Sequence, residues 1–227
     1  MIAHPAIFAH GTVKDVLIIG GGDGGTAREV LKHPAIEKVT MVEIDEMVIN
    51  ACKEHLPTFS SAFSNPRLNL TNEDGISFVK KIPNNSYDLV LVDGSDPVGP
   101  AEGLFSTAYY NNCHRIFKKS GILVAQGESP KFNEHAFKEL NHPLKDIFGQ
   151  DKTYISLFFA LTYPTGMWSF QWGIKDNKSP LTFDESKADK FVKQKGLGYY
   201  NSQIHQASFA MPGFVNEMLS ESRKSLK

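Results

Sequence analysis

A run of glycines broken only by Asp23 occupies positions 20–25 and constrains the fold more than any other feature of the chain. The apolar residues 16–19 precede it, as in a strand buried on both faces of a parallel sheet. Residues 26–32 favour a helix, which a His-Pro pair ends. This order predicts a turn that approaches a nucleotide-type ligand, with Gly20 and Gly22 as contacts; a structural turn without ligand is the alternative.

The alternation of strand and helix continues along the chain. Strands are predicted at 38–43, 67–70, 88–93 and 122–126, separated by helices at 48–56, 76–82 and 109–117. Such an order implies right-handed crossovers and an α/β fold with a doubly wound, mostly parallel sheet. After a helix at 133–148, two strands at 154–161 and 168–174 are joined by a Pro/Gly turn and predict an antiparallel edge. A helix at 184–195 follows.

Composition restricts the partners and the compartment. The 227 residues suffice for one large core, so we expect a single domain at 1–216 and a polar tail at 217–227. The 24 basic and 25 acidic residues form no basic stripe for nucleic acid, and no apolar run is long enough for a membrane span. Cys52 and Cys113 lie outside any ligand motif, so we expect a cytoplasmic protein that acts on small molecules.

Histidines offer no metal site. His33, His55 and His114 are scattered along the chain without ligand spacing, and we interpret them as packing or surface residues. We therefore expect neither a metal nor a bound cofactor.

Acidic residues stand in the glycine turn and after the next two strands. Asp23 would repel a pyrophosphate, which disfavours a dinucleotide and favours a ligand with positive charge. Glu43 ends the second strand, where an acidic side chain accepts hydrogen bonds from a ribose diol. Asp74 and Gly75 follow the third strand and could meet an adenine amino group, although a surface turn explains them equally well. Together these residues favour a nucleoside without phosphates.

The fourth strand ends in a loop, residues 93–100, that carries two further carboxylates. Asp93 and Asp96, with Ser95 between them, emerge at the carboxyl end of the sheet, where open α/β folds place ligands. Aspartate is also a common turn former ahead of Gly and Pro, so the loop alone is ambiguous. Only in combination with Asp23 and Glu43 does it become a candidate reactive site.

Five segments together resemble the motifs of spermidine synthases. They cover nearly the whole chain: residues 16–25, 39–45, 93–105, 162–170 and 199–212. The resemblance implies a Rossmann-like, methyltransferase-type fold. It also implies transfer of an aminopropyl group from the co-substrate decarboxylated S-adenosylmethionine to putrescine, which gives spermidine and methylthioadenosine in polyamine biosynthesis.

The resemblance further implies roles for individual residues. Asp93 matches the proton acceptor of these enzymes, and Tyr163 matches a tyrosine at the diamine. Asp23 and Asp96 match residues that hold amine groups, and Ser95, next to Asp96, is expected to contribute to the same amine site. The residues that match the nucleoside contacts are Glu43, Asp74, Gly75 and Pro100.

The chemistry of this transfer is consistent with those residues. An amine of putrescine should titrate near ~10, so a base must help to provide the neutral nucleophile. Asp93 can accept the proton if burial raises its pKa, with Tyr163 orienting the amine. Asp23 would repel the carboxylate of intact S-adenosylmethionine but attract the ammonium of the decarboxylated donor.

One part of the family pattern has no expected counterpart. Spermidine synthases carry a small N-terminal β domain that supplies a glutamine at the nucleoside and a Tyr-His or Tyr-Gln pair at the amine. This sequence begins with residues that resemble those just after that pair, so we expect the domain to be absent. The same domain helps to form the family's oligomers, and a homodimer or homotetramer would be weakened without it.

Two other functions remain open on the residues alone. An S-adenosylmethionine-dependent methyltransferase would use the glycine turn and Glu43 equally well, although Asp23 and the Asp93/Asp96 pair argue against it. A catalytically idle nucleoside-binding domain is the second alternative, because part of the amine site is expected to be missing.

Overall fold

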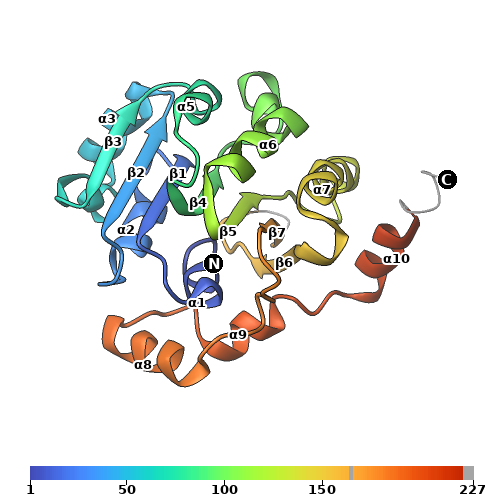
Figure 1. The fold of residues 1–227 in the computed structure, drawn as a ribbon. Helices are drawn as coiled ribbons and strands as arrows, with labels where there is room; N and C mark the ends of the chain where they lie inside the picture. Colours follow the sequence, from blue (N-terminus) through green and yellow to red (C-terminus); the bar gives the residue numbers. More distant parts are fainter. Residues whose placement is uncertain (164–165, 222–227) are drawn as a thin grey trace.

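A twisted sheet forms the centre of the molecule, with helices on both of its faces (Figure 1). The structure is a computed structural model that describes residues 1–163 and 166–221, apart from the side chains of Pro100 and Glu221. Within this part the seven strands lie in the order β3-β2-β1-β4-β5-β7-β6. Their bounds are β1 Asp15–Gly20, β2 Lys38–Glu43, β3 Leu68–Asn72, β4 Tyr87–Asp93, β5 Phe117–Gln126, β6 Thr153–Phe159 and β7 Met167–Ile174.

The sheet has a parallel part and an antiparallel part. Strands β1 to β5 pair in parallel, and β7 runs antiparallel between β5 and β6. The predicted doubly wound, mostly parallel sheet with an antiparallel edge is therefore confirmed. Of the two strands expected at that edge, only β6 is the outer one, because β7 pairs on both sides.

Helices surround the sheet, and most of them pack on its two faces, whereas α8 packs against α1. The longer ones are α2 Gly25–Leu31, α3 Glu46–His55, α5 Gly75–Lys81, α6 Thr107–Ile116, α7 Glu134–Phe148 and α8 Glu185–Lys195. The shorter or terminal ones are α1 His4–His10, α4 Pro57–Ser60, α9 Ser202–Ala207 and α10 Gly213–Glu221, with 3-10 turns η1 Ser61–Ser64, η2 Gly99–Phe105 and η3 Gln150–Lys152. Aspartates at the first residue before α3, α5 and α8 accept hydrogen bonds from the free N–H groups of these helices.

Two apolar layers hold the helices to the sheet. Along β1, Val16 and Ile18 face one layer with α1 and α2, whereas Leu17 and Ile19 face the other with α5, α6 and α7. Successive strand residues point to opposite faces, so a strand that is apolar at every position is buried on both. This arrangement leaves the carboxyl ends of the strands free for a ligand site.

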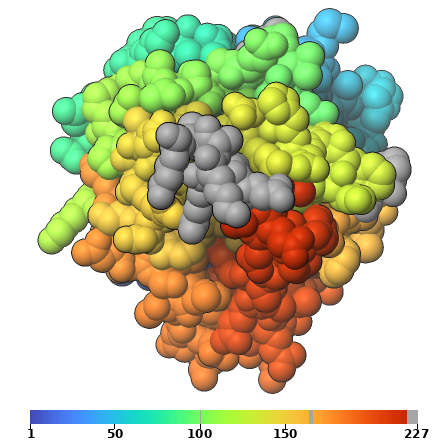
Figure 2. Space-filling model, turned by 90° about the vertical axis from the view of Figure 1, so that its right-hand side faces the viewer, coloured from blue at the N-terminus to red at the C-terminus, as the bar shows by residue number. Residues whose placement is uncertain are grey.

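The ends of the chain differ from the prediction. Helix α1 was not expected, although Pro5 in its first turn and Gly11 at its end are ordinary helix signals. The tail expected from Glu217 overlaps α10, whose Val215 and Met218 are buried against α7 and β6. Figure 2 shows α10, in red, beside the yellow residues of α7. Residues 222–227 of the predicted tail, and 164–165 of the predicted turn, lie outside the described residues.

Gly20→Ala should destabilise the fold much more than Gly11→Ala. Both glycines have positive φ, +81° and +84°, so alanine costs each about 1 kcal/mol of backbone strain. A Cβ at Gly20 would lie 2.3 Å from the carbonyl oxygen of Asp93, whereas one at Gly11 meets nothing within 4 Å. The extra loss at Gly20 should exceed about 2 kcal/mol in urea unfolding. Equal losses in the two variants would contradict the close approach.

Candidate active site

A cavity of about 510 Å³ opens at the carboxyl ends of β1, β2 and β4. Most of the residues predicted from the sequence line it: Gly20, Gly22, Asp23, Glu43, Asp74, Gly75, Asp93 and Ser95. Four apolar side chains, Ile19, Ile44, Val48 and Leu104, complete much of the wall. The combination of apolar walls and convergent carboxylates suits a ligand with a flat apolar part and polar or cationic groups.

The glycine turn lies directly against the end of β4. Gly20 and Asp93 are register partners in the parallel β1–β4 pair, and the N–H of Gly21 donates to the carbonyl oxygen of Asp93 at 2.8 Å. A side chain at Gly20 would collide with that carbonyl. The turn can therefore approach β4 only because residue 20 has no Cβ.

Asp93 is half-buried and held in place by Thr26. The hydroxyl of Thr26, in the first turn of α2, donates to Oδ2 of Asp93 at 2.6 Å. Burial raises the pKa of Asp93, the Thr26 hydrogen bond opposes this rise, and the negative charge of Asp23 adds to it. A carboxyl with a raised pKa in a cavity is a candidate for proton transfer. Thr26 was not predicted as a site residue, since a threonine after a glycine turn carries no distinctive signal.

Asp23 is exposed at the tip of the glycine turn. Its Oδ1 accepts a hydrogen bond from the N–H of Gly25 at 2.7 Å, and in residues 1–163 and 166–221 no ion pair to its carboxylate is found. The charge is thus available to a cationic group of a ligand.

Glu43 and Gly22 form one wall together. Oε1 of Glu43 accepts from the N–H of Asp45 at 3.0 Å, and a Cβ at Gly22 would lie 2.9 Å from Oε2. The absent side chain of Gly22 therefore leaves room for the Glu43 carboxylate at the cavity wall.

Asp74 has partners of its own. Its carboxylate caps α5 by accepting from the N–H groups of Ile76 and Ser77, and from the Ser77 hydroxyl at 2.7 Å. Burial would raise the pKa of Asp74, but these hydrogen bonds outweigh it and lower the pKa. Capping of α5 is a sufficient reason for an aspartate at position 74 without any ligand. Asp74 also lines the cavity, so the nucleoside contact stays a prediction.

Asp96 and Tyr163 do not line the cavity but belong to a second group beside it. Gln126 at the end of β5 connects the members, because its Nε2 lies 3.5 Å from Oδ1 of Asp96 and its Oε1 accepts from Trp168 Nε1 at 3.2 Å. The Tyr163 ring packs edge-on against Trp168 at 4.7 Å. Burial raises the pKa of Tyr163, and the nearby charges of Asp93 and Asp96 raise it further. The side chain of Pro100 lies outside the described residues.

Glu128 belongs to the same group and was missed from the sequence. It is fully buried with a positive φ of 69°, and its carboxylate accepts hydrogen bonds from Gln126 at 2.9 Å and from Asn133. Burial raises the pKa of Glu128, and Asp96 contributes to the rise. Two residues after a strand end, a glutamate is usually surface-exposed, so only the tertiary structure reveals this third carboxyl group.

Metal-binding clusters and membrane-spanning helices are both missing from residues 1–163 and 166–221. No group of three or more His, Cys, Asp or Glu side chains is arranged to hold a metal ion there. None of the helices there has the length and apolar character needed to cross a membrane.

The fold and the cavity define a Rossmann-like protein with a candidate ligand site at the carboxyl ends of its strands. Residues 1–184 match the spermine/spermidine synthase domain, and the chain belongs to this family. The resemblance seen in the sequence is thereby confirmed.

Known relatives are similar over almost the whole chain. A polyamine aminopropyltransferase of Moorella thermoacetica is 43% identical over 219 residues, which cover 96% of this chain and 75% of the relative. One of Clostridioides difficile is 45% identical over 224 residues, 97% of this chain and 77% of the relative. Among solved structures, a spermidine synthase in complex with the transition state analogue AdoDATO has a TM-score of 0.91 at 39% identity, covering 97% of this chain and 74% of its own. Thermotoga maritima spermidine synthase has a TM-score of 0.89 at 39% identity, and the match covers 97% of this chain and 73% of that structure's chain.

Thr26→Val should raise the pKa of Asp93 further. Valine has nearly the shape of threonine but lacks the hydroxyl that stabilises the ionised carboxylate. The titration of Asp93, followed by carbon NMR of its labelled carboxyl group, should therefore move to higher pH. Thr26→Ser retains the hydroxyl and is the control, with a titration close to that of the wild type. An unchanged titration in Thr26→Val would show that the hydrogen bond does not set the pKa.

Proposed function

We propose that the protein transfers the aminopropyl group of decarboxylated S-adenosylmethionine to putrescine, forming spermidine and methylthioadenosine. The observation that carries this proposal is Asp93, a half-buried carboxyl group that lines the cavity and whose charge also acts on Tyr163 in the neighbouring group. The relatives named polyamine aminopropyltransferase and the spermidine synthase structures support the same activity.

The donor occupies the 510 Å³ cavity in this proposal. The ribose hydroxyls hydrogen-bond to Glu43, and the adenine lies between apolar side chains such as Ile44 and Leu104. Asp23 faces the ammonium at the end of the aminopropyl group. Gly20, Gly22, Asp74 and Gly75 complete the wall around the nucleoside.

The transfer is a displacement at carbon. The lone pair of a neutral amine of putrescine attacks the methylene group next to the sulfonium. The carbon–sulfur bond breaks, and its electron pair stays on sulfur, which leaves as the neutral thioether of methylthioadenosine. This leaving group needs no acid, so the catalytic problem is to provide an unprotonated amine.

Asp93 accepts the proton of the attacking amine. Burial raises the pKa of its carboxyl group, which brings it closer to the amine and makes proton transfer less unfavourable. Thr26 fixes the orientation of the carboxylate. Tyr163 orients the amine, and the negative charges of Asp93 and Asp96 favour its uncharged phenol form.

The remote amine of putrescine remains a cation and needs an anion. Asp96, with Ser95 beside it in the same loop, supplies that charge in our proposal. Glu128 adds a second carboxyl group, which Gln126 connects to Asp96. Binding of the ammonium offsets the repulsion between these carboxyl groups.

The proposal extends to partners and location. The partners are small molecules and a second copy of the chain in a homodimer or homotetramer. Cys52 and Cys113 are free and buried, which supports a cytoplasmic location. We also propose that residues 1–216 act as one catalytic domain, to which the rest of α10 belongs as well, since Met218 is buried against α7 and β6.

Incubation with decarboxylated S-adenosylmethionine and putrescine should yield spermidine and methylthioadenosine, detected by mass spectrometry. Asp93→Asn is the matched control: it should lower turnover by about 100-fold or more, because the base is lost, while the donor still binds. A methylated product from intact S-adenosylmethionine would instead support a methyltransferase. Donor binding without turnover by the wild type would support an idle nucleoside-binding domain.

Asp23→Asn should weaken the preference for the decarboxylated donor over intact S-adenosylmethionine by about tenfold, since the repelling charge is removed. Affinities of both donors, measured by calorimetry, give the preference. Glu46→Gln, an exposed acidic residue outside the cavity wall, is the charge-matched control and should leave it unchanged. An unchanged preference in Asp23→Asn would remove Asp23 as the discriminating residue.

A further inference from the structure

We propose that Arg28 is a positioning residue for Asp23, acting through the segment of residues 57–64, which we call the buttress segment. The inference rests on the proposed function, because it concerns how the donor's ammonium is recognised. Arg28 touches neither the cavity nor Asp23, and its role follows from a chain of contacts that ends at the glycine turn.

The first link is the position of Asp23. The hydrogen bond from Gly25 N–H ties the side chain to the first residue of α2, so it fixes Asp23 only relative to the glycine turn and that end of the helix. Gly21 and Gly24 have positive φ, +70° and +82°. Because glycine has no Cβ, its backbone can adopt more conformations than that of other residues, so the turn itself does not fix the direction of Asp23 rigidly. The direction of the Asp23 carboxylate therefore depends on what packs against the turn from outside.

The second link is the buttress segment, which consists of α4 and η1. Its Phe59 and Phe63 pack against the outer side of the turn: a Cβ at Gly24 would lie 2.9 Å from the Phe63 ring and 3.0 Å from the Phe59 carbonyl oxygen. One at Gly25 would lie 3.2 Å from the Phe59 ring and equally close to the Asp23 carboxylate. Phe59 thus packs against Gly25, whose N–H holds the Asp23 carboxylate.

The third link is Arg28, which holds the buttress segment. Phe59 is 38% exposed, so burial alone secures it weakly. The Arg28 guanidinium lies 4.8 Å from the centre of the Phe59 ring, and its Nη1 donates to the carbonyl oxygen of Thr58 at 3.3 Å. The Ser61 hydroxyl donates to the same carbonyl at 3.2 Å. A planar, charged group can stack on a ring and reach a backbone carbonyl at once.

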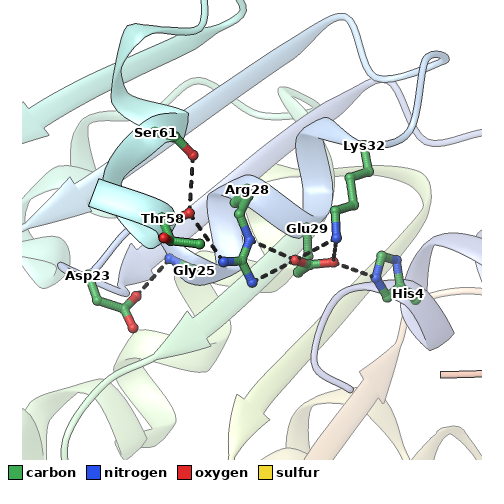
Figure 3. Close-up of polar contacts among 8 residues, drawn as sticks. All are labelled: His4, Asp23, Gly25, Arg28, Glu29, Lys32, Thr58 and Ser61. Carbon is green, nitrogen blue, oxygen red and sulfur yellow. Dashed lines mark hydrogen bonds and ion pairs between the residues drawn. The ribbon is translucent and has the colours of Figure 1, made fainter. Parts of the chain in front are cut away.

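The fourth link orients Arg28. Its Nε and Nη2 each lie 2.8 Å from Oε1 of Glu29, and Glu29 also accepts from His4 at 3.0 Å and Lys32 at 2.7 Å (Figure 3). Burial would raise the pKa of Glu29, but the hydrogen bonds from these three residues lower it, so the carboxylate stays ionised. The guanidinium is thereby aligned between Glu29 and the buttress segment, as Figure 3 shows.

The geometry separates this role from general support of the cavity. Gly21 is held by the Asp93 carbonyl, and Gly22 packs against Glu43 and Val48; neither contact involves the buttress segment. Loss of Arg28 should therefore disturb Asp23 more than the nucleoside end. Decarboxylated S-adenosylmethionine carries the ammonium that Asp23 would meet, and methylthioadenosine lacks it.

The test compares the affinities of Arg28→Gln and wild type for these two ligands by calorimetry. Arg28→Gln should weaken binding of decarboxylated S-adenosylmethionine about tenfold and that of methylthioadenosine less than about twofold. Arg28→Lys keeps the charge near Glu29 but cannot stack and donate together, so it should resemble Arg28→Gln. Lys14→Gln removes an exposed cation that pairs with Glu37, outside this chain of contacts, and should bind both ligands like the wild type.

Two further measurements decide the outcome. In an Asp23→Asn background, Arg28→Gln should cause little additional loss, because both changes act through the same carboxylate. In the single variant Arg28→Gln, amide hydrogen exchange should be faster than in the wild type in the peptides that cover residues 23–27 and 57–64. Equal weakening for both ligands, additive losses, or unchanged exchange would each overturn the role of Arg28. Absence of spermidine formation by a wild type that binds the donor selectively would overturn the proposed function and leave this inference standing.

Discussion

The close approach of the glycine turn to the end of β4 is the contact on which the site depends. Backbone to backbone, Gly21 donates to the Asp93 carbonyl, and Gly20 has no Cβ to separate the two strands there. This places the first turn of α2 beside the Asp93 carboxylate, so that Thr26 can reach it. The same approach brings Asp23 to the cavity rim. A wider separation would leave Asp93 without its hydrogen-bond partner and the cavity without one wall.

Much of the fold could be predicted because it follows local patterns. The β2 strand is found at the predicted residues 38–43, and the apolar run of β1 predicted a strand buried on both faces. The order β7 before β6 was not predictable, since hairpin strands look alike whichever one pairs with the parallel sheet. Helix α10 extends into the segment predicted as a polar tail, and the sequence does not reveal this because its apolar contacts lie with α7 and β6, distant in sequence.

The candidate site was predictable where backbone constraints mark it and not where side chains meet across elements. Asp23, Glu43 and Asp93 stand at strand ends or in the glycine turn, positions with a known relation to ligands in this type of sheet. Thr26 and Glu128 contribute through hydrogen bonds to residues far along the chain. Asp74 lines the cavity, but the sequence did not reveal that it also caps α5.

Helix α2 explains how so few residues support both ends of the glycine turn. Ala27 and Val30 are buried against the sheet, which fixes the helix, and Thr26 lies close enough to that face to reach Asp93. Arg28 projects instead toward the buttress segment, where it donates to the Thr58 carbonyl oxygen. Because side chains of a helix are fixed relative to one another, the turn before α2 is bounded by Asp93 on one side and by the buttress segment on the other. Asp23 and Asp93 therefore share α2 as one mechanical support.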